Sequence, residues 1–462
     1  MPWLGKIPSH WECVPSRAVF REIKEQGHQD EPLLSVTITR GIVSQSDLLE
    51  NTSKKDSSNL DRSKYKLVLP NDFAYNKMRA WQGAVGVSKY RGIVSPAYVV
   101  VRLRNPDYPP YFHYFLRMPT YSKEAERWSY GITPDMWSLR PEHFRLIEVC
   151  VPPPSEQTQI ARFLDWKTAQ INRFIRNKKR LIELLKEQKW NIINQAVTKG
   201  LDPNVKLKPS DVEWIGDIPE HWEARRLRTL AAVRASGVDK NTNEDEVSVM
   251  LCNYVDVYKN DRITAVIDFM KATVTPEEIR AFELKAGDVI ITKDSESWDD
   301  IAIPTFVPEA LPGIVCAYHL ALIRPFSGEI EGEFLFRAFS SDPVADQFRI
   351  AATGVTRFGL AQGVIKGAFF PLPPLEEQRA IIAHINEKCA EICQAISRAQ
   401  REIELMREYR TRLISDVVTG QVDVRGIAVP DVIPEDLSEP VDDSVGEEDL
   451  AELNLEEEPV EA

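Results

Sequence analysis

The chain has 462 residues, which is too long for one hydrophobic core and predicts two to four domains. Hydrophobic residues make up 43% of it and charged residues 27%, a composition typical of soluble proteins with packed cores. No apolar run reaches the length of about 18 residues that a membrane-spanning helix needs, and the N-terminus lacks the pattern of a secretory signal. Six cysteines without a CxxC pair are typical of reduced thiols, so we expect a cytoplasmic protein.

The net charge of −13 argues against a polyanionic partner such as DNA, but this charge is unevenly distributed. Residues 426–462 carry 14 acidic side chains and no Lys or Arg, which predicts a disordered acidic tail. The preceding residues therefore sum to +1, and the stretch 17–150 carries +5. The objection to a DNA partner falls away, although the stretch 225–371 carries −5.

The sequence contains an internal repeat. WLGKIPSHWE, which starts at Trp3, returns as WIGDIPEHWE, which starts at Trp214. Five further pairs follow in the same order: DFAYNK (72–77) with DVIITK (288–293), GIVSPAY (92–98) with GIVCAY (313–318), GIT (131–133) with GVT (354–356), PPPSEQ (152–157) with PPLEEQ (373–378), and AVTKGLD (196–202) with VVTGQVD (417–423). Each half is therefore one unit of the same kind.

The first globular domain is expected at residues 1–154 and opens with a Trp- and Pro-rich segment at 1–16. The second is expected at 201–374 and opens with the equivalent segment at 211–224. Both contain short β-rich runs, such as AYVVVRL at 97–103, which Gly and Pro interrupt about every ten residues. This pattern predicts mixed α/β (α+β) domains, because a doubly wound sheet would show longer helices between its strands.

A long helix is expected after each domain, at 155–200 and 375–421. Apolar residues recur in both at spacings of three and four, in matching register: Leu164, Ile171, Ile175, Ile182, Leu185, Ile192 and Ala196 in the first, and Ile385, Cys389, Ile392, Ile396, Ala399, Ile403, Met406, Leu413 and Val417 in the second. Two matching heptad stripes in one chain predict that the helices pack together as an antiparallel coiled coil. Each helix of about 45 residues would form a rod of about 67 Å.

Motifs for catalysis are not found in the sequence. There is no phosphate-binding GxxxxGK[ST] loop, no HExxH and no Cys/His cluster at zinc spacing, so we expect neither a catalytic nor a metal site. His10 and His221 each stand beside a Trp, where packing and hydrogen bonding are the better interpretation. Asn105-Pro106-Asp107-Tyr108 comes near the NPPY loop of amino-methyltransferases, but no Gly-rich cofactor turn precedes it.

Binding residues are more evident. A stretch of the first half mixes cations with aromatic and amide side chains that can hold phosphates and bases: Lys77, Arg79, Trp81, Gln82, Lys89, Tyr90 and Arg91. The corresponding stretch of the second half differs in character and offers Lys293, Ser295 and Ser297. The repeated glycine turns supply secondary candidates, Thr133 in one half and Thr356 with Arg357 in the other. The two halves share their scaffold motifs but differ in their loops. This pattern favours two domains that recognise different DNA sequences.

The repeated WxGxIPxHWE motif, the GIVSPAY-type strand, the PPxEQ helix start and the heptad helix together resemble the specificity subunit of type I restriction-modification systems. The resemblance covers residues 1 to about 425 and implies two target recognition domains separated by two antiparallel helices. Each domain would read one half of a split double-stranded DNA site, and the helices would set the spacing. The acidic tail lies outside the resemblance.

The resemblance also implies partners. The chain would not be an enzyme and would bind no cofactor itself. It would dock two modification subunits, which use S-adenosylmethionine to methylate adenine, and restriction subunits, which use ATP and Mg²⁺. Two alternatives stay open: an adenine-N6 DNA methyltransferase that acts by itself, and a coiled-coil scaffold that binds proteins without reading DNA.

Overall fold

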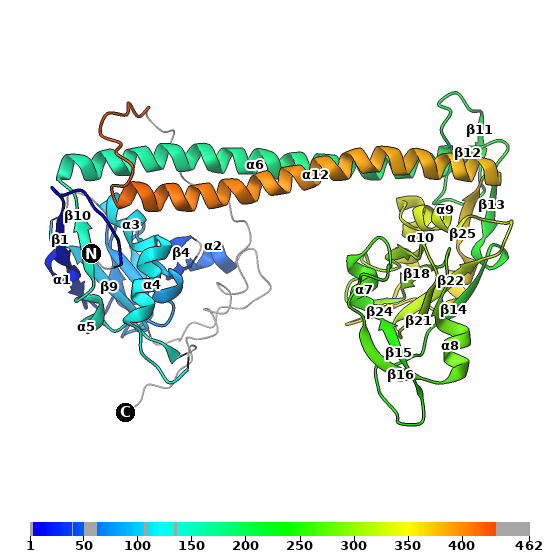
Figure 1. The fold of residues 1–462 in the computed structure, drawn as a ribbon, viewed down its shortest axis with the longest axis horizontal. Helices are drawn as coiled ribbons and strands as arrows, with labels where there is room; N and C mark the ends of the chain where they lie inside the picture. The colour runs from blue at the N-terminus through cyan, green and yellow to red at the C-terminus, as the bar shows by residue number, and fades with distance from the viewer. Residues whose placement is uncertain (1–2, 39, 50–61, 106–108, 134–135, 431–462) are drawn as a thin grey trace. The chain divides into compact units, whose positions relative to one another are not determined.

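The computed structural model describes residues 3–430, apart from residue 39 and the segments 50–61, 106–108 and 134–135. From residue 431 onward, the expected acidic tail lies outside the described residues. The chain divides into two compact units (Figure 1): unit 1 comprises Met1–Arg180 together with Ala399–Ala462, and unit 2 comprises Leu181–Arg398. Both divisions fall inside long helices, so each unit contains a part of both helices.

Unit 1 is built on an antiparallel four-stranded sheet with the strand order β2-β9-β6-β7. These strands are β2 (Phe20–Ile23), β9 (Tyr98–Leu103), β6 (Phe73–Asn76) and β7 (Val85–Val87). The valine-rich run of β9 suits a strand with two covered faces, because branched side chains pack well on a pleated surface. β6 lies between two neighbours and is buried along its whole length.

The other strands of unit 1 form antiparallel ladders: β1 (Glu12–Pro15) with β10 (Glu148–Val151), β3 (Leu34–Thr37) with β4 (Gly41–Ser44), and β5 (Lys66–Val68) with β8 (Gly92–Val94). Its short helices are α1 (Ser16–Val19), α2 (Gln45–Leu49), η1 (Ala80–Gln82), α3 (Pro109–Arg117), α4 (Pro119–Arg127) and α5 (Pro141–Phe144). Aromatic side chains fill the core between sheet and helices. The ring of Phe20 lies 5.4 Å from those of Phe73 and Phe112, edge to face.

Unit 2 repeats this topology. Its first sheet has the order β14-β22-β18-β20, and its second the order β16-β15-β21-β17, which corresponds to β4-β3-β8-β5 of unit 1. In unit 1 the parallel bridge between Leu33 and Ile93 stands where β15 and β21 form a full parallel pair. The strands are β14 (Ala231–Ala235), β22 (Leu320–Pro325), β18 (Val289–Thr292), β20 (Pro304–Phe306), β16 (Met270–Val274), β15 (Val247–Cys252), β21 (Leu311–Cys316) and β17 (Glu283–Leu284).

The remaining elements of unit 2 frame these sheets. Its strands include β11 (Leu207–Pro209) paired with β12 (Asp217–Pro219), β13 (Glu223–Arg226) paired with β25 (Phe369–Leu372), and a small sheet of β19 (Asp294–Ser295), β24 (Phe358–Gly359) and β23 (Thr353–Gly354). Its helices are η3 (Leu227–Thr229), α7 (Tyr254–Lys259), α8 (Pro276–Phe282), α9 (Gly332–Phe339), α10 (Asp342–Ala351) and α11 (Gln362–Gly367).

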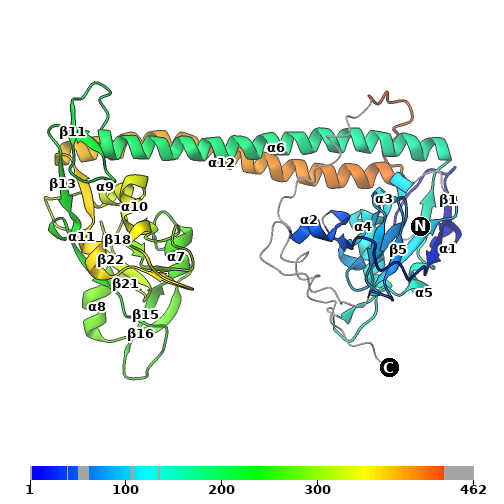
Figure 2. The ribbon, with the colours of Figure 1, turned by 180° about the vertical axis from the view of Figure 1, so that it is seen from behind.

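The two long helices are α6 (Pro154–Lys199) and α12 (Leu375–Val418), and they lie side by side in both views (Figure 2). In unit 1, Arg410 Nη1 donates to Asn172 Oδ1 at 2.9 Å, and Lys178 Nζ lies 2.6 Å from Glu402 Oε2, so the helices run antiparallel. In unit 2, Ile193 of α6 shares a hydrophobic core with Ile385 of α12.

Most of the expected heptad residues are buried, including Ile175 and Ile385 at 0% exposure. Near the end of α6 the seam differs from the expected one: Ile193 is buried, whereas the expected Ile192 is half-buried. The reason is that α6 packs there on the globular core of unit 2 as well as on α12.

Glycine ends both long helices earlier than expected. α6 ends at residue 199 rather than 200, and α12 at 418 rather than 421. Gly200 and Gly420 follow these ends with φ of 74° and 72°, the left-handed conformation in which glycine stops a helix. A side chain on Gly420 would also collide with the ring of Pro8.

The repeated Trp-His segments, residues 3–12 and 214–223, attach to the starts of the long helices. In unit 1, Trp11 Nε1 donates to Glu156 at 3.0 Å, and His10 Nε2 lies 2.8 Å from the same carboxylate. In unit 2, Trp222 and His221 contact Glu377 at the same two distances. The interpretation of the two histidines as packing and hydrogen-bonding residues therefore agrees with this geometry.

The expected fold is confirmed: it is mixed α/β, with two similar domains and two long antiparallel helices. The repeat landmarks occupy equivalent strands, helix starts and helix ends in the two units.

Candidate nucleic-acid interface

Two loops of unit 1 that carry candidate residues lie together. Loop A of unit 1 (residues 77–82) follows β6 and contains η1, while loop B of unit 1 (residues 130–138) precedes α5. Leu139 N donates to the carbonyl of Lys77 at 2.8 Å, directly after loop B. The rings of Trp81 and Trp137 meet edge to face at 5.6 Å. The structure therefore brings Thr133 into the same cluster of loops as Lys77, Arg79, Trp81 and Gln82.

The same two loops come together in unit 2. Loop A of unit 2 (residues 293–298) follows β18, and its strand β19 pairs with β24 in loop B of unit 2 (residues 353–359). Leu360 N donates to the carbonyl of Lys293 at 2.8 Å, which is the counterpart of the bond from Leu139. Lys293, Ser295 and Ser297 thus share one cluster with Thr356 and Arg357.

Lys89, Tyr90 and Arg91 belong to a different place. They form the exposed turn between β7 and β8, and Arg91 Nε is bonded to Glu31 at 2.7 Å. β7, which leads into this turn, lies against α3, because Val87 N donates to His113 Nδ1 at 3.4 Å. Phe73 at the start of β6 stands opposite Val87, so the turn lies at the strand end away from Lys77. Burial, together with the charges of Arg117 and Lys89, lowers the pKa of His113 to about 3. The expected continuous binding stretch is therefore split in two.

Within loop A of unit 1, several candidate side chains already have partners. Arg79 Nη1 donates to Gln82 Oε1 at 3.0 Å, and Trp81 Nε1 donates to the carbonyl of Met78 at 2.8 Å. Lys77, Arg79, Trp81 and Gln82 are all half-buried. Trp81 therefore holds the loops together, while the Arg79–Gln82 pair presents a fixed polar edge.

Loop A of unit 2 is acidic, and several of its polar side chains are hydrogen-bonded within the loop or to residues next to it. Burial of Asp294 opposes its ionisation, but hydrogen bonds from His319 and Lys293 outweigh burial and lower the pKa of its carboxyl group. Ser295 is buried at 4% exposure, and the Ser297 hydroxyl donates to Asp299. In contrast, Thr356 and Arg357 of loop B are exposed.

An ion pair with a buried carboxylate stands at the start of β6 and at the start of β18, at the strand end opposite to loop A. Asp72, which starts the DFAYNK motif, is 1% exposed and accepts from Arg102 Nη2 at 2.8 Å. Asp288 of DVIITK is equally buried and accepts from Arg324 Nη2 at 2.7 Å. Sequence reasoning missed both arginines, although they stand at equivalent places in β9 and β22.

The second missed feature is the apolar residue at the tip of each loop B. Ile132 is 92% exposed and Val355 is 93% exposed. The repeated GIT and GVT motifs were a signal for these positions, but a branched apolar residue in a sequence does not by itself indicate exposure.

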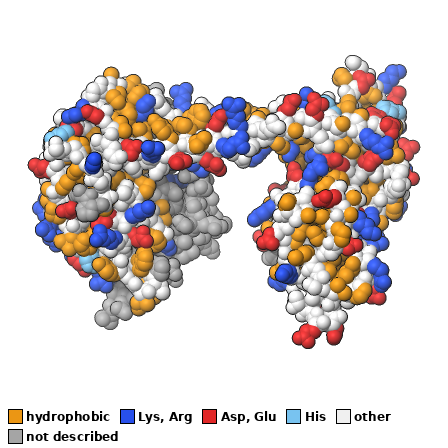
Figure 3. Space-filling model, viewed as in Figure 1, with side chains coloured by type: hydrophobic (Ala, Val, Ile, Leu, Met, Phe, Trp, Pro, Cys, Tyr) orange, Lys and Arg blue, Asp and Glu red, His pale blue; other side chains and the backbone are white. Residues whose placement is uncertain are grey.

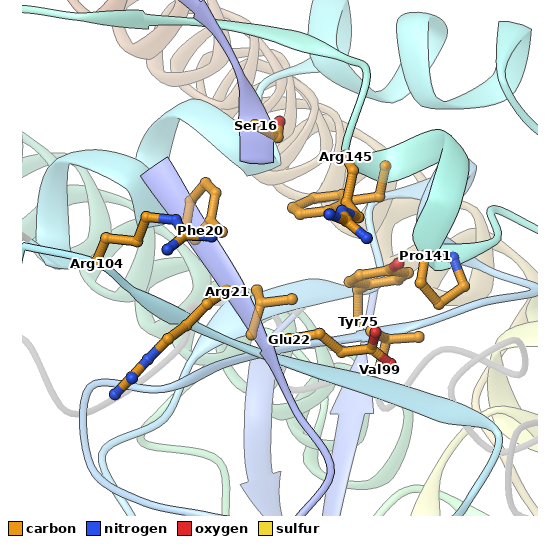
Figure 4. Close-up of a pocket in the computed structure, with 11 residues that line it drawn as sticks. Ser16, Phe20, Arg21, Glu22, Tyr75, Val99, Arg104, Pro141 and Arg145 are labelled. Carbon is orange, nitrogen blue, oxygen red and sulfur yellow. The ribbon is translucent and has the colours of Figure 1, made fainter. Parts of the chain in front are cut away.

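A cavity of unit 1 lies beside the cluster of loops A and B, between β2, β9 and α5 (Figure 4). Arg21, Arg104 and Arg145 line it together with the stacked rings of Tyr75 and Phe144, whose centroids are 5.0 Å apart. Its remaining lining residues are Ser16, Phe20, Glu22, Val99, Val101 and Pro141. The Ser16 hydroxyl donates its proton to the carbonyl of Ile147 and not to a side chain that could act as a general base, so the geometry does not indicate a serine nucleophile.

The described residues offer neither a metal site nor a membrane-spanning helix. No group of three or more His, Cys, Asp and Glu side chains among them is arranged to hold a metal ion. None of their helices combines the length and apolar character that a membrane crossing needs.

Curated proteins that are similar in sequence are specificity subunits of type I restriction enzymes. The chain is 25% identical over 211 residues to a Methanocaldococcus jannaschii protein named for the MjaX specificity subunit (45% of this chain, 48% of the relative). It is 23% identical over 286 residues to the MjaVIII specificity subunit of that organism (62% and 64%) and 22% identical over 406 residues to the StySPI specificity subunit of Salmonella potsdam (83% of each). The chain thus matches only about half to two thirds of the length of the two archaeal relatives.

Solved structures show the same fold. A chain from a structure of the assembly and conformational transition of a type I R-M system matches with a TM-score of 0.68 and 12% identity, over 90% of this chain and all of that one. The HsdS subunit of Thermoanaerobacter tengcongensis matches with a TM-score of 0.50 and 14% identity, over 90% and 98% of the two chains. No protein-family model matches. The resemblance to type I specificity subunits is confirmed.

Proposed function

We propose that this chain is the specificity subunit of a type I restriction-modification system and that each of its units reads one half of a bipartite DNA site. One observation carries the proposal: loops A and B form the same cluster at the ends of equivalent strands in both units, while their side chains differ. A common scaffold with different loops suits two readers of different sequences.

The chemistry of the two clusters supports different half-sites. Unit 1 offers cations and an amide in Lys77, Arg79 and Gln82, side chains that bond phosphates and the acceptor edges of bases. Unit 2 offers Arg357 beside carboxylates such as Glu296, and carboxylates accept hydrogen bonds from the amino group of cytosine. The paired helices α6 and α12 would then fix the number of base pairs between the two half-sites.

The long helices also suggest where partners dock. Leu184 on α6 and Leu405 on α12 are equivalent positions of the repeat, and they are 45% and 63% exposed. Two equivalent apolar contacts fit two copies of one partner, the modification subunit, which would supply S-adenosylmethionine and methylate adenine. Restriction subunits would add ATP and Mg²⁺. The chain itself would act in the cytoplasm as a non-catalytic subunit.

A domain exchange tests the proposal. Residues 12–151 are replaced by the matching segment of another specificity subunit, so that β1 and β10 are exchanged together and their ladder stays intact. Methylated positions are then mapped in DNA from cells that carry the chimera with the modification subunits. We expect a change in one half of the methylated sequence only.

Other outcomes would support the alternatives. A change in both halves or in neither would contradict modular reading. Methyl transfer by the purified chain alone, lost on Asn105→Ala, would support a methyltransferase. If the assembled complex bound DNA with the same affinity and salt dependence after Lys77→Ala, Arg79→Ala and Arg357→Ala together, a protein scaffold would be favoured.

A further inference from the structure

The tips of the two B loops share an unusual property. Each consists of a glycine, a branched apolar residue and a threonine, and the apolar residue is almost wholly in solvent in both units. Exposed apolar side chains are common over both units (Figure 3), so exposure alone is no evidence of function. Its repetition at one position of two diverged loops requires an explanation.

The backbone of each tip is built to hold this side chain outward. A Cβ atom on Gly131 would collide with the carbonyl of Met136, and one on Gly354 would collide with the carbonyl of Arg357. Only glycine fits at both positions, because the two arms of the turn approach closely there. Ile132 and Val355 each follow such a glycine and leave the turn on its solvent side.

Each tip also has other apolar neighbours in its loop cluster. In unit 1, Tyr130 and Met136 of loop B are 58% and 56% exposed. In unit 2, Trp298 of loop A is 52% exposed. In unit 2 the apolar tip stands on the same loop as Arg357, and in unit 1 its loop lies against Lys77. Such a pair of an apolar side chain and a cation suits a partner with negative charges on its surface and apolar groups in its interior. Duplex DNA, with phosphates outside and stacked bases inside, has this chemistry.

We propose that Ile132 and Val355 are wedges that enter the base stack of the two half-sites and partly unstack one base step in each. This inference rests on the proposed function and adds a mechanical role to base reading. Apolar side chains that insert between base pairs bend DNA and so increase its contact with protein. Unstacking one step also lowers the cost of extruding a neighbouring base, which a methyltransferase partner requires.

Fluorescence of 2-aminopurine tests the wedge. The full chain is assembled with its modification subunits and bound to a duplex whose half-sites come from methylation mapping. 2-Aminopurine, which brightens on unstacking, replaces one base at a time. We expect a rise at one step in each half-site. Ile132→Ala should abolish the rise in the half read by unit 1, Val355→Ala in the other half, and each should weaken binding on the order of tenfold.

Val266 supplies a matched control. It is 92% exposed in unit 2 and lies outside loops A and B, five residues after Asp261, which contacts Lys189 of α6. Val266→Ala should change neither fluorescence nor affinity. Because the substituted side chains are exposed, folding is not at risk, and the salt dependence of binding should stay unchanged since no phosphate contact is lost.

Three results would overturn the wedge: no fluorescence rise at any position in the wild-type complex, an unchanged rise in both alanine variants, or relaxed preference for thymine at one position without a change in fluorescence. The last result would assign the tips to thymine methyl groups instead. A wild-type complex that binds DNA without sequence preference would contradict the proposed function itself, and the wedge with it.

Discussion

At the scale of single residues, the PPxEQ motif has a physical explanation in its last two positions. The glutamate accepts the indole N–H of a buried Trp, and the glutamine amide donates to a proline carbonyl, Gln157 to Pro152 and Gln378 to Pro373. Each bond satisfies the N–H of a buried side chain, the indole or the glutamine amide, at the start of a long helix. The motif thus fastens a helix start to the Trp-His segment.

We expect Glu377→Ala to destabilise unit 2 by about 1–3 kcal/mol, because Trp222 is fully buried and its indole N–H would lose its acceptor. Urea denaturation of the intact chain measures this loss. Glu376→Ala is the control, since the Glu376 side chain is 88% exposed and pairs only with Arg379 among the described residues. Its effect should stay within about 0.5 kcal/mol. Equal losses in both variants would contradict the role assigned to Glu377.

At the scale of elements, periodicity predicted the long helices well. Heptad spacing, and the Gly and Pro residues at the helix ends, are local signals. The predicted ends of the two helices therefore differ from the observed ends by only a few residues. The pairing of loop A with loop B could not be predicted, because it depends on ladders such as β19 with β24, whose members are far apart in sequence. Lys89 was grouped with Lys77, but β6 and β7 form an antiparallel hairpin in which Phe73 stands opposite Val87, so Lys89 lies at the strand end away from Lys77.

The exposed leucines of the long helices lead to an element-scale prediction. Leu184→Asp and Leu405→Asp should each reduce the number of bound modification subunits from two to one, because a charge cannot be buried in an apolar contact without a partner. The double variant should bind none. Mass measurement of the assembled complex distinguishes these states. Unfolding should be unaffected because both side chains face solvent, and retention of two subunits by the double variant would place docking elsewhere.

At the scale of the whole molecule, charge is divided sharply along the chain. The described residues end at 430, and all 14 carboxylates of the acidic tail follow that point. Residues 1–430 therefore carry a net charge of +1 and the complete chain −13. On the proposed function, the carboxylates of the tail would repel the phosphates of DNA, whereas cations of the loop clusters such as Lys77 and Arg357 would attract them.

Removal of residues 431–462 should therefore strengthen non-specific DNA binding at low salt several-fold and leave it nearly unchanged at high salt, where repulsion is screened. This truncation keeps Ile427, whose carbonyl accepts from Gln159 at 2.7 Å, so unit 1 stays closed. Titration of non-cognate duplex at two salt concentrations measures the effect. Equal affinity of both forms at low salt would mean that the tail does not oppose DNA.

Unit 1 consists of two segments that are far apart in the sequence, and this determines the order in which the two units can fold during synthesis. Its core requires the last part of α12 and the residues beyond it: the Tyr111 hydroxyl donates to the carbonyl of Val418 at 3.1 Å, and Gln159 bonds to that of Val424 at 3.0 Å. Unit 2, residues 181–398, leaves the ribosome before any of these residues. Domains usually complete their folding from the N-terminus onward, but here the first domain to begin is the last to close. In a nascent chain, unit 2 can therefore complete its folding before the second part of α12 is synthesised. Until then, the apolar face of the first part of α6, up to residue 180, has no partner helix.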